Sequence, residues 1–99
     1  LVSNCEIARN GYYGVLIAES TAVTLRGNMM EGNDRSAVML EFLVHGSADV
    51  TIEDNLIQYN NGDGISSYAS KNLKIRNNTV IGNRKRATDI SEAKTILMH

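Results

Sequence analysis

Seven residues in the central and C-terminal parts of the chain carry side chains that can exchange a proton or hold a polar ligand. Asp63, His45 and Tyr68 are candidate catalytic residues, because carboxyl, imidazole and phenol groups act as general acids and bases. The candidate substrate-binding residues are Arg35, Glu41, Ser66 and Asp89. These positions span more than half of the sequence, so they form a site only if the fold brings them to one face.

Most of these residues also have a simpler structural interpretation. Asp63 stands between two glycines, where a turn residue is expected. His45 precedes a glycine and fits an exposed loop. Glu41 and Asp89 are carboxylates that would keep an exposed face soluble, and Tyr68 is either a ligand platform or a surface residue that covers a neighbouring strand. The sequence leaves both interpretations open.

Composition limits the class of protein. The chain has 99 residues, 42% of them hydrophobic, and a formal net charge of −1, which fits a single domain. Basic residues are not concentrated, and no apolar stretch reaches the roughly 18 residues of a membrane span, so we expect neither a nucleic-acid nor a membrane partner. The chain begins at Leu1 rather than methionine, which indicates a processed product or a segment of a longer protein.

An internal repeat organises the whole sequence. Asparagines recur at spacings of 23, 27 and 23 residues, at Asn10, Asn33, Asn60 and Asn83. Five residues before each of them stand Cys5, Asn28, Asn55 and Asn78. Five apolar columns repeat with the same spacing, and their first members are Ile7, Val15, Ile17, Val23 and Leu25. Only Ser67 and Thr88 interrupt these columns.

The repeat predicts an all-β solenoid rather than helices. Each unit holds three short apolar segments, bounded by Gly, Asn, Asp and Ser, and two of the segments alternate with the period of a strand. Stacked on one another at about 4.8 Å, such units form a parallel β-helix. We therefore expect about four coils of 23–27 residues, each with three strands.

The asparagine columns have a physical explanation of their own. Asparagine tolerates the left-handed backbone conformation that a sharp bend between strands needs, so we expect these residues at the bends. The side-chain amide can also donate to the identical amide one coil away and build a ladder. Cys5 would then stand at the outermost rung as a small buried thiol.

Two of the repeats resemble a known superfamily. Asn10-Gly11-Tyr12-Tyr13-Gly14-Val15 and Asn60-Asn61-Gly62-Asp63-Gly64-Ile65 are similar to repeats of the pectin lyase-like superfamily, most of all to those of alginate (mannuronan) C5-epimerases and related periplasmic carbohydrate-binding proteins. The resemblance implies a right-handed, single-stranded parallel β-helix over residues 1–99, as part of a longer β-helix. It also implies a secreted, cell-surface or periplasmic protein with an acidic polysaccharide as its partner.

The resemblance also implies where a linear polysaccharide would bind. In these families the groove lies on the sheet formed here by residues 15–18, 38–41, 65–68 and 88–91. The outward-facing positions of these strands are Leu16, Met39, Ser66 and Asp89 in one column and Ala18, Glu41, Tyr68 and Ser91 in the next. Just before the strands, we expect a further column of Tyr13, Arg35, Asp63 and Arg86.

Epimerases and lyases of this kind remove a proton from the sugar carbon next to a carboxylate, which requires a base, an acid and a group that neutralises the carboxylate. On the groove face, Asp63, Tyr68 and His45 are the candidates for proton transfer, and His45 lies in the four-residue insertion of the second coil. The Asp-Pro-His signature of the epimerases is missing, because the chain has no proline. Catalysis is therefore left open.

Two further alternatives concern ions and assembly. No cofactor is expected, with calcium as the one alternative, held by Glu41, Asp63 and Asp89 if they stack on successive coils. The second alternative is a structural or adhesin-type β-helix without catalysis, as in phage tailspikes or surface proteins. Such a protein would self-associate through its open coil ends, where strand edges lack partners.

Overall fold

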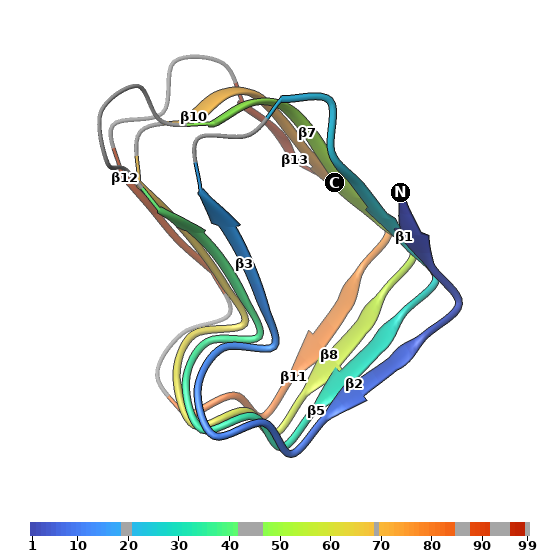
Figure 1. The fold of residues 1–99 in the computed structure, drawn as a ribbon, viewed down its shortest axis with the longest axis vertical. Coiled ribbons are helices and arrows are strands. Elements are labelled where there is room, and N and C mark those ends of the chain that lie inside the picture. Colours follow the sequence, from blue (N-terminus) through green and yellow to red (C-terminus); the bar gives the residue numbers. More distant parts are fainter. Residues whose placement is uncertain (19–20, 42–46, 69, 85–87, 92–95, 99) are drawn as a thin grey trace.

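In the computed structural model, the described residues form thirteen short β-strands and no helix (Figure 1). The structure describes residues 1–18, 21–41, 47–68, 70–84, 88–91 and 96–98. Side chains are described within these ranges, apart from residues 41, 47, 48, 68, 70, 71 and those from 88 onward. Within this part of the chain, no helix is long and apolar enough to cross a membrane.

The strands form three sheets, which we name A, B and C. Sheet A has the order β1 (Val2–Ser3), β4 (Thr24–Arg26), β7 (Ser47–Glu53), β10 (Ser70–Arg76) and β13 (Ile96–Met98). Sheet B contains β2 (Glu6–Ala8), β5 (Met29–Glu31), β8 (Leu56–Gln58) and β11 (Thr79–Ile81). Sheet C contains β3 (Val15–Ala18), β6 (Val38–Glu41), β9 (Ile65–Tyr68) and β12 (Thr88–Ser91).

The chain visits the sheets in the order B, C, A and then repeats, so that every strand pairs in parallel with its equivalent one coil away. Figure 1 looks along the stack, with the three sheets as the sides of a coil and equivalent strands behind one another. The molecule extends 20 Å along its shortest axis, which fits about four coils at roughly 4.8 Å each. The predicted all-β parallel β-helix is thus confirmed.

The strand register confirms the apolar columns. In sheet B, Ile7 pairs with Met30 and Met30 with Ile57, as the spacing predicts. The inward side chains of all three sheets meet in one core. Its fully buried apolar members include Leu25, Met30, Val38, Leu40, Val50, Ile52, Ile57, Ile65 and Leu73. The four additional residues of the second coil fall between β6 and β7, beyond the last residue of the sheet C strand.

The asparagine columns form two hydrogen-bonded ladders inside the coils. In each step between two asparagines, Oδ1 of one accepts both the backbone N–H and the side-chain amide of its equivalent in the preceding coil. In one ladder, Oδ1 of Asn55 accepts from the backbone nitrogen of Asn28 at 2.9 Å and from its Nδ2 at 3.1 Å. Asn28 and Asn55 are 2% exposed, so these bonds satisfy groups that water does not reach.

The predicted backbone conformation of these asparagines is wrong. The left-handed residue is the one immediately before each ladder position, and its occupants are Asn4, Arg9, Gly27, Gly32, Asp54, Tyr59, Asn77 and Gly82. The left-handed residue turns the chain at the corner, and the following residue then directs its side chain inward. An asparagine must lie after the bend for its amide to reach the ladder.

The prediction that Cys5 is buried is also wrong. Cys5 is exposed, because it lies at the outermost rung of its ladder. Its backbone nitrogen still donates to Oδ1 of Asn28 at 3.0 Å, so the rung is partly preserved without an asparagine. Its thiol donates to the carbonyl oxygen of Ser3 at 3.1 Å.

A column of charged side chains crosses the outer face of sheet A. Glu53 lies between Arg26 and Arg76 of the neighbouring coils, with oxygen–nitrogen distances of 2.8 and 2.7 Å. Glu53 itself is 8% exposed. Hydrogen bonds first from Arg26 and then from Arg76 hold the pKa of its carboxyl below the ordinary value of 4.5.

The lowered pKa of Glu53 makes stability depend on acid pH. Because the folded state favours the carboxylate, the stabilisation is fully present above pH 4.5, the ordinary pKa, and is lost as pH falls through the lower folded pKa. Glu53→Gln should therefore be less stable than the unmodified protein at neutral pH and lose less stability on acidification. Urea unfolding at a series of pH values measures both effects.

The matched control is Glu6→Gln, since Glu6 pairs with Arg9 at 3.9 Å and both side chains are exposed. This variant should keep the acid dependence of the unmodified protein. If Glu53→Gln lost stability on acidification as steeply as the unmodified protein, Glu53 would not be the group responsible for the pH dependence.

Candidate functional site

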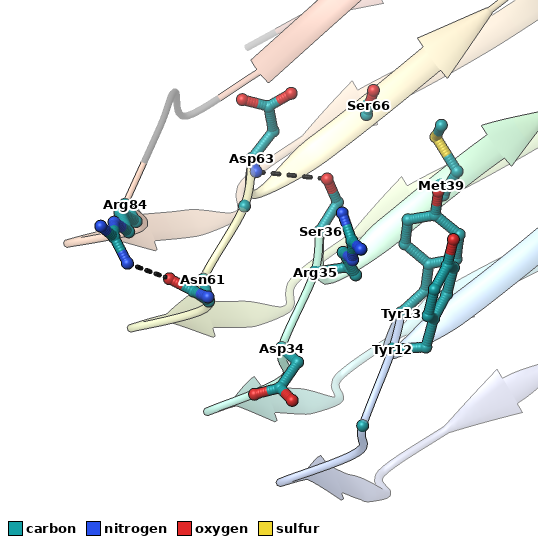
Figure 2. Close-up of a pocket in the computed structure, with 12 residues that line it drawn as sticks. Tyr12, Tyr13, Asp34, Arg35, Ser36, Met39, Asn61, Asp63, Ser66 and Arg84 are labelled. Atoms are coloured by element: carbon teal, nitrogen blue, oxygen red, sulfur yellow. Dashed lines mark hydrogen bonds between the residues drawn. The ribbon is translucent and has the colours of Figure 1, made fainter.

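A groove of about 770 Å³ runs across the stack where the chain turns from sheet B into sheet C (Figure 2). Residues 11–13, 34–36 and 61–63 of three successive turns line it, together with Arg84 of the fourth coil. Met39 and Ser66, at outward positions of β6 and β9, complete the lining. We refer to this feature as the groove.

Backbone hydrogen bonds between coils hold the turns in register. The nitrogen of Arg35 donates to the carbonyl oxygen of Tyr12 at 3.0 Å. The nitrogen of Arg84 donates to the carbonyl oxygen of Asn60 at 2.9 Å. Because the ladders fix these turns, side chains from positions far apart in sequence are placed side by side along the groove.

One end of the groove is aromatic. The rings of Tyr12 and Tyr13 meet edge to face, with centroids 4.6 Å apart and an angle of 85° between their planes. The guanidinium carbon of Arg35 lies 5.1 Å from the centroid of the Tyr12 ring. Figure 2 shows the two tyrosines next to Met39. This end offers ring faces and a cation to a ligand.

The other end of the groove is polar. Nη1 of Arg84 donates to Oδ1 of Asn61 at 3.0 Å, and both residues are exposed. The backbone nitrogen of Asp63 donates to Oγ of Ser36 at 3.2 Å. Asp63 is only 6% exposed and Ser36 only 8%, so their hydrogen bond belongs to the wall of the groove. Hydrogen-bonding groups and a second cation are therefore available at this end.

The arginines in the groove differ from those elsewhere on the described surface. Arg26 and Arg76 are paired with Glu53, and Arg9 lies near Glu6. Among the described residues, neither Arg35 nor Arg84 has a carboxylate within 4.0 Å. The groove thus carries two guanidinium groups that form no ion pair with a described side chain, although Asp34 and Asp63 also line it.

The structure brings three of the seven predicted site residues into the groove: Asp63, Arg35 and Ser66. The backbone of Asp89 pairs with Ser66 on the next coil, so Asp89 occupies the same column. Glu41 and Tyr68 end their strands, on the side of sheet C away from the turns that form the groove. The side chains of Asp89, Glu41 and Tyr68, and the whole of His45, lie outside the described part of the structure.

The predicted column of Tyr13, Arg35 and Asp63 is wrong by one residue. Arg35 pairs through its backbone with Tyr12, and the equivalent of Tyr13 is Ser36. This shift decides the chemistry, because it places the guanidinium of Arg35 over the Tyr12 ring.

Tyr12, Asp34, Asn61 and Arg84 also line the groove, although they are not among the predicted site residues. The repeat spacing contains a signal for three of them, since Asp34, Asn61 and Arg84 stand directly after the asparagines of one ladder.

The register also separates the three carboxylates considered for calcium. Glu41 pairs with Ala18, whereas Asp89 pairs with Ser66, and Asp63 lies in the turn before β9. They occupy different positions along the coil and do not stack. Among the described residues, no group of three or more His, Cys, Asp or Glu side chains is arranged to hold a metal ion.

Comparison with known proteins identifies the family. The family model described as "Right handed beta helix region" matches residues 1–98, so the chain belongs to the right-handed β-helix family. The match supports the resemblance to pectin lyase-like β-helices without singling out the alginate epimerases. It fits carbohydrate binding, carbohydrate modification or adhesin-type roles. Searches of curated proteins and of solved structures found no similar protein.

Proposed function

We propose that this β-helix binds a linear acidic polysaccharide in the groove. The observation that carries the proposal is the pair of arginines, Arg35 and Arg84, which line one groove without a carboxylate partner among the described residues. A guanidinium group binds carboxylate and sulfate oxygens through two parallel hydrogen bonds, so an acidic sugar supplies the missing partner. Such a ligand implies a secreted, cell-surface or periplasmic protein.

The shape of the groove favours a chain over a compact ligand. Its lining comes from four successive coils, which are separated by about 4.8 Å each. A pyranose unit in an extended chain is comparable in length to one coil spacing, so neighbouring sugars would meet equivalent positions of neighbouring coils. Tyr12 and Tyr13 offer ring faces on which a sugar ring packs through its C–H groups.

Binding is better supported than modification of the sugar. A lyase-like or C5-epimerase reaction needs an acid or base that reaches the sugar ring. Asp63 is the candidate catalytic residue with a described side chain, and at 6% exposure it has little surface to offer. Its backbone nitrogen is also bonded to Ser36 in the groove wall. We therefore assign Asp63 to the shape of the groove rather than to proton transfer.

Titration calorimetry with trisaccharides of mannuronate, guluronate and galacturonate tests the proposal. At least one should bind, with an affinity that falls as salt is added, because the contacts are exposed and ionic. Arg84→Ala should weaken binding by roughly tenfold, the loss of one charge-assisted contact. Arg9→Ala is the matched control, since Arg9 is exposed but does not line the groove. No binding of any acidic trisaccharide would overturn the proposal and favour an adhesin-type role.

A further inference from the structure

One face of the Tyr12 ring is covered by the side chain of Arg35. Tyr12 is 56% exposed, yet the guanidinium carbon of Arg35 lies 5.1 Å from its ring centroid, within the range of a cation–π contact. The edge-to-face contact with Tyr13, at 4.6 Å between centroids, limits rotation of the Tyr12 ring. A ring face suited to a sugar is therefore already occupied by a side chain of the protein.

The backbone of Arg35 is held next to Tyr12, whereas its side chain can move. The backbone nitrogen of Arg35 donates to the carbonyl oxygen of Tyr12 at 3.0 Å, which keeps the two residues next to each other on adjacent coils. Among the described residues, no carboxylate lies within 4.0 Å of the Arg35 side chain, and the residue is exposed. The flexible side chain can therefore leave the ring while its backbone stays in place.

A guanidinium group and a pyranose ring cannot occupy the same ring face at once. A sugar that packs on this face of Tyr12 must first displace Arg35 and remove the cation–π contact. A neutral sugar gives the displaced guanidinium no new partner of comparable strength. An acidic sugar supplies a carboxylate, which forms a charge-assisted pair with the same guanidinium.

We propose that Arg35 makes the groove selective for acidic sugars by exchanging the Tyr12 ring for the sugar carboxylate. This inference rests on the proposed binding function and adds the residue that sets its specificity. Arg35 would act against neutral sugars as well as in favour of acidic ones, and specificity often combines the two. Arg84, which has no ring partner among the described residues, would contribute attraction alone.

The test compares one ligand with its own neutral form. The probe is the uronate trisaccharide that binds most tightly, alongside the same trisaccharide with its carboxyl groups methyl-esterified. For Arg35→Ala, we expect the acidic form to bind roughly tenfold more weakly, as expected for the loss of a charge-assisted pair. The methyl ester should bind about twofold to threefold more tightly, because the ring is no longer covered.

Three controls separate the exchange from simpler effects. Arg84→Ala should weaken the acidic form and leave the methyl ester unchanged. Tyr12→Ala should weaken both forms, because it removes the ring. The chain has no tryptophan, so the near-ultraviolet absorbance reports on tyrosines. The acidic ligand should give a difference spectrum in the unmodified protein that is altered in Arg35→Ala.

Two results for Arg35→Ala would overturn the inference. Equal weakening of both ligand forms would mean that Arg35 only maintains the turn. Weaker acidic binding with unchanged ester binding would mean an ordinary ion pair that does not cover the ring. If the unmodified protein binds neither form, both the inference and the proposed function are wrong. If it binds the acidic form and either of the first two results is obtained, the inference is wrong and the proposed function is retained.

Discussion

Replacement of Asn60 by alanine is expected to lower the free energy of unfolding by about 3 to 5 kcal/mol, because it leaves several buried polar groups without partners. Oδ1 of Asn60 accepts the backbone nitrogen of Asn33 at 3.0 Å and its Nδ2 at 2.8 Å. Nδ2 of Asn60 donates to the carbonyl oxygen of Met30 at 3.2 Å. Asn60 is 1% exposed and Asn33 is fully buried, so water cannot replace the lost bonds.

Two other asparagines, Asn61 and Asn10, provide controls for this prediction. Asn61→Ala removes an exposed side chain that, among the described residues, accepts a hydrogen bond from exposed Arg84, so a change within about 0.5 kcal/mol is expected. Asn10→Ala affects the outermost rung of the same ladder, where the residue is exposed, and should have an intermediate effect.

Urea unfolding followed by circular dichroism measures all three variants. If Asn60→Ala unfolds the protein outright, the intermediate loss expected in Asn10→Ala, compared with the small change in Asn61→Ala, still tests the ladder. A loss below about 1 kcal/mol in Asn60→Ala would show that the ladder stabilises the stack little.

The core could be predicted from sequence because the repeat carries the register. Once the ladder asparagines are aligned, every apolar column follows, and Met30 and Ile57 pair as expected. The position of the left-handed residues was missed even though one corner column contains Gly27, Asp54 and Asn77, which favour that conformation. A second column alternates Arg9 and Tyr59, which do not favour that conformation, with Gly32 and Gly82, and a third contains Ala22, Asp49 and Asn72.

The site was harder to predict, for two physical reasons. Each sheet C strand has two outward positions, and the alternating pattern does not tell which of them borders a hollow. The groove borders the column of Met39 and Ser66, whereas Ala18, the member of the other outward column with a described side chain, does not line it. In addition, turn residues carry no period-two pattern, so only the 23-residue repeat spacing aligns Arg35 with Tyr12 rather than with Tyr13.

Replacement of Gly62 by alanine is expected to destabilise the protein by about 2 to 3 kcal/mol and to reduce ligand binding strongly, because there is no room for a methyl group. A Cβ at Gly62 would lie 2.6 Å from the backbone nitrogen of Ser36 and 2.8 Å from the carbonyl carbon of Arg35. These neighbours belong to the backbone of the second coil, which the ladders hold in place. The turns of the two coils would have to separate at the positions that carry Arg35 and Asp63.

Gly11→Ala is the matched control, because Gly11 occupies the first of these turns and also lines the groove. A Cβ there would meet nothing within 4 Å. Neither Gly11 nor Gly62 has a positive φ, so the two substitutions differ in space and not in backbone strain. Gly11→Ala should fold and bind like the unmodified protein in the same unfolding and calorimetry experiments. Normal binding by a folded Gly62→Ala variant would mean that the ligand does not depend on the close approach of these coils, and would place the binding site elsewhere on the stack.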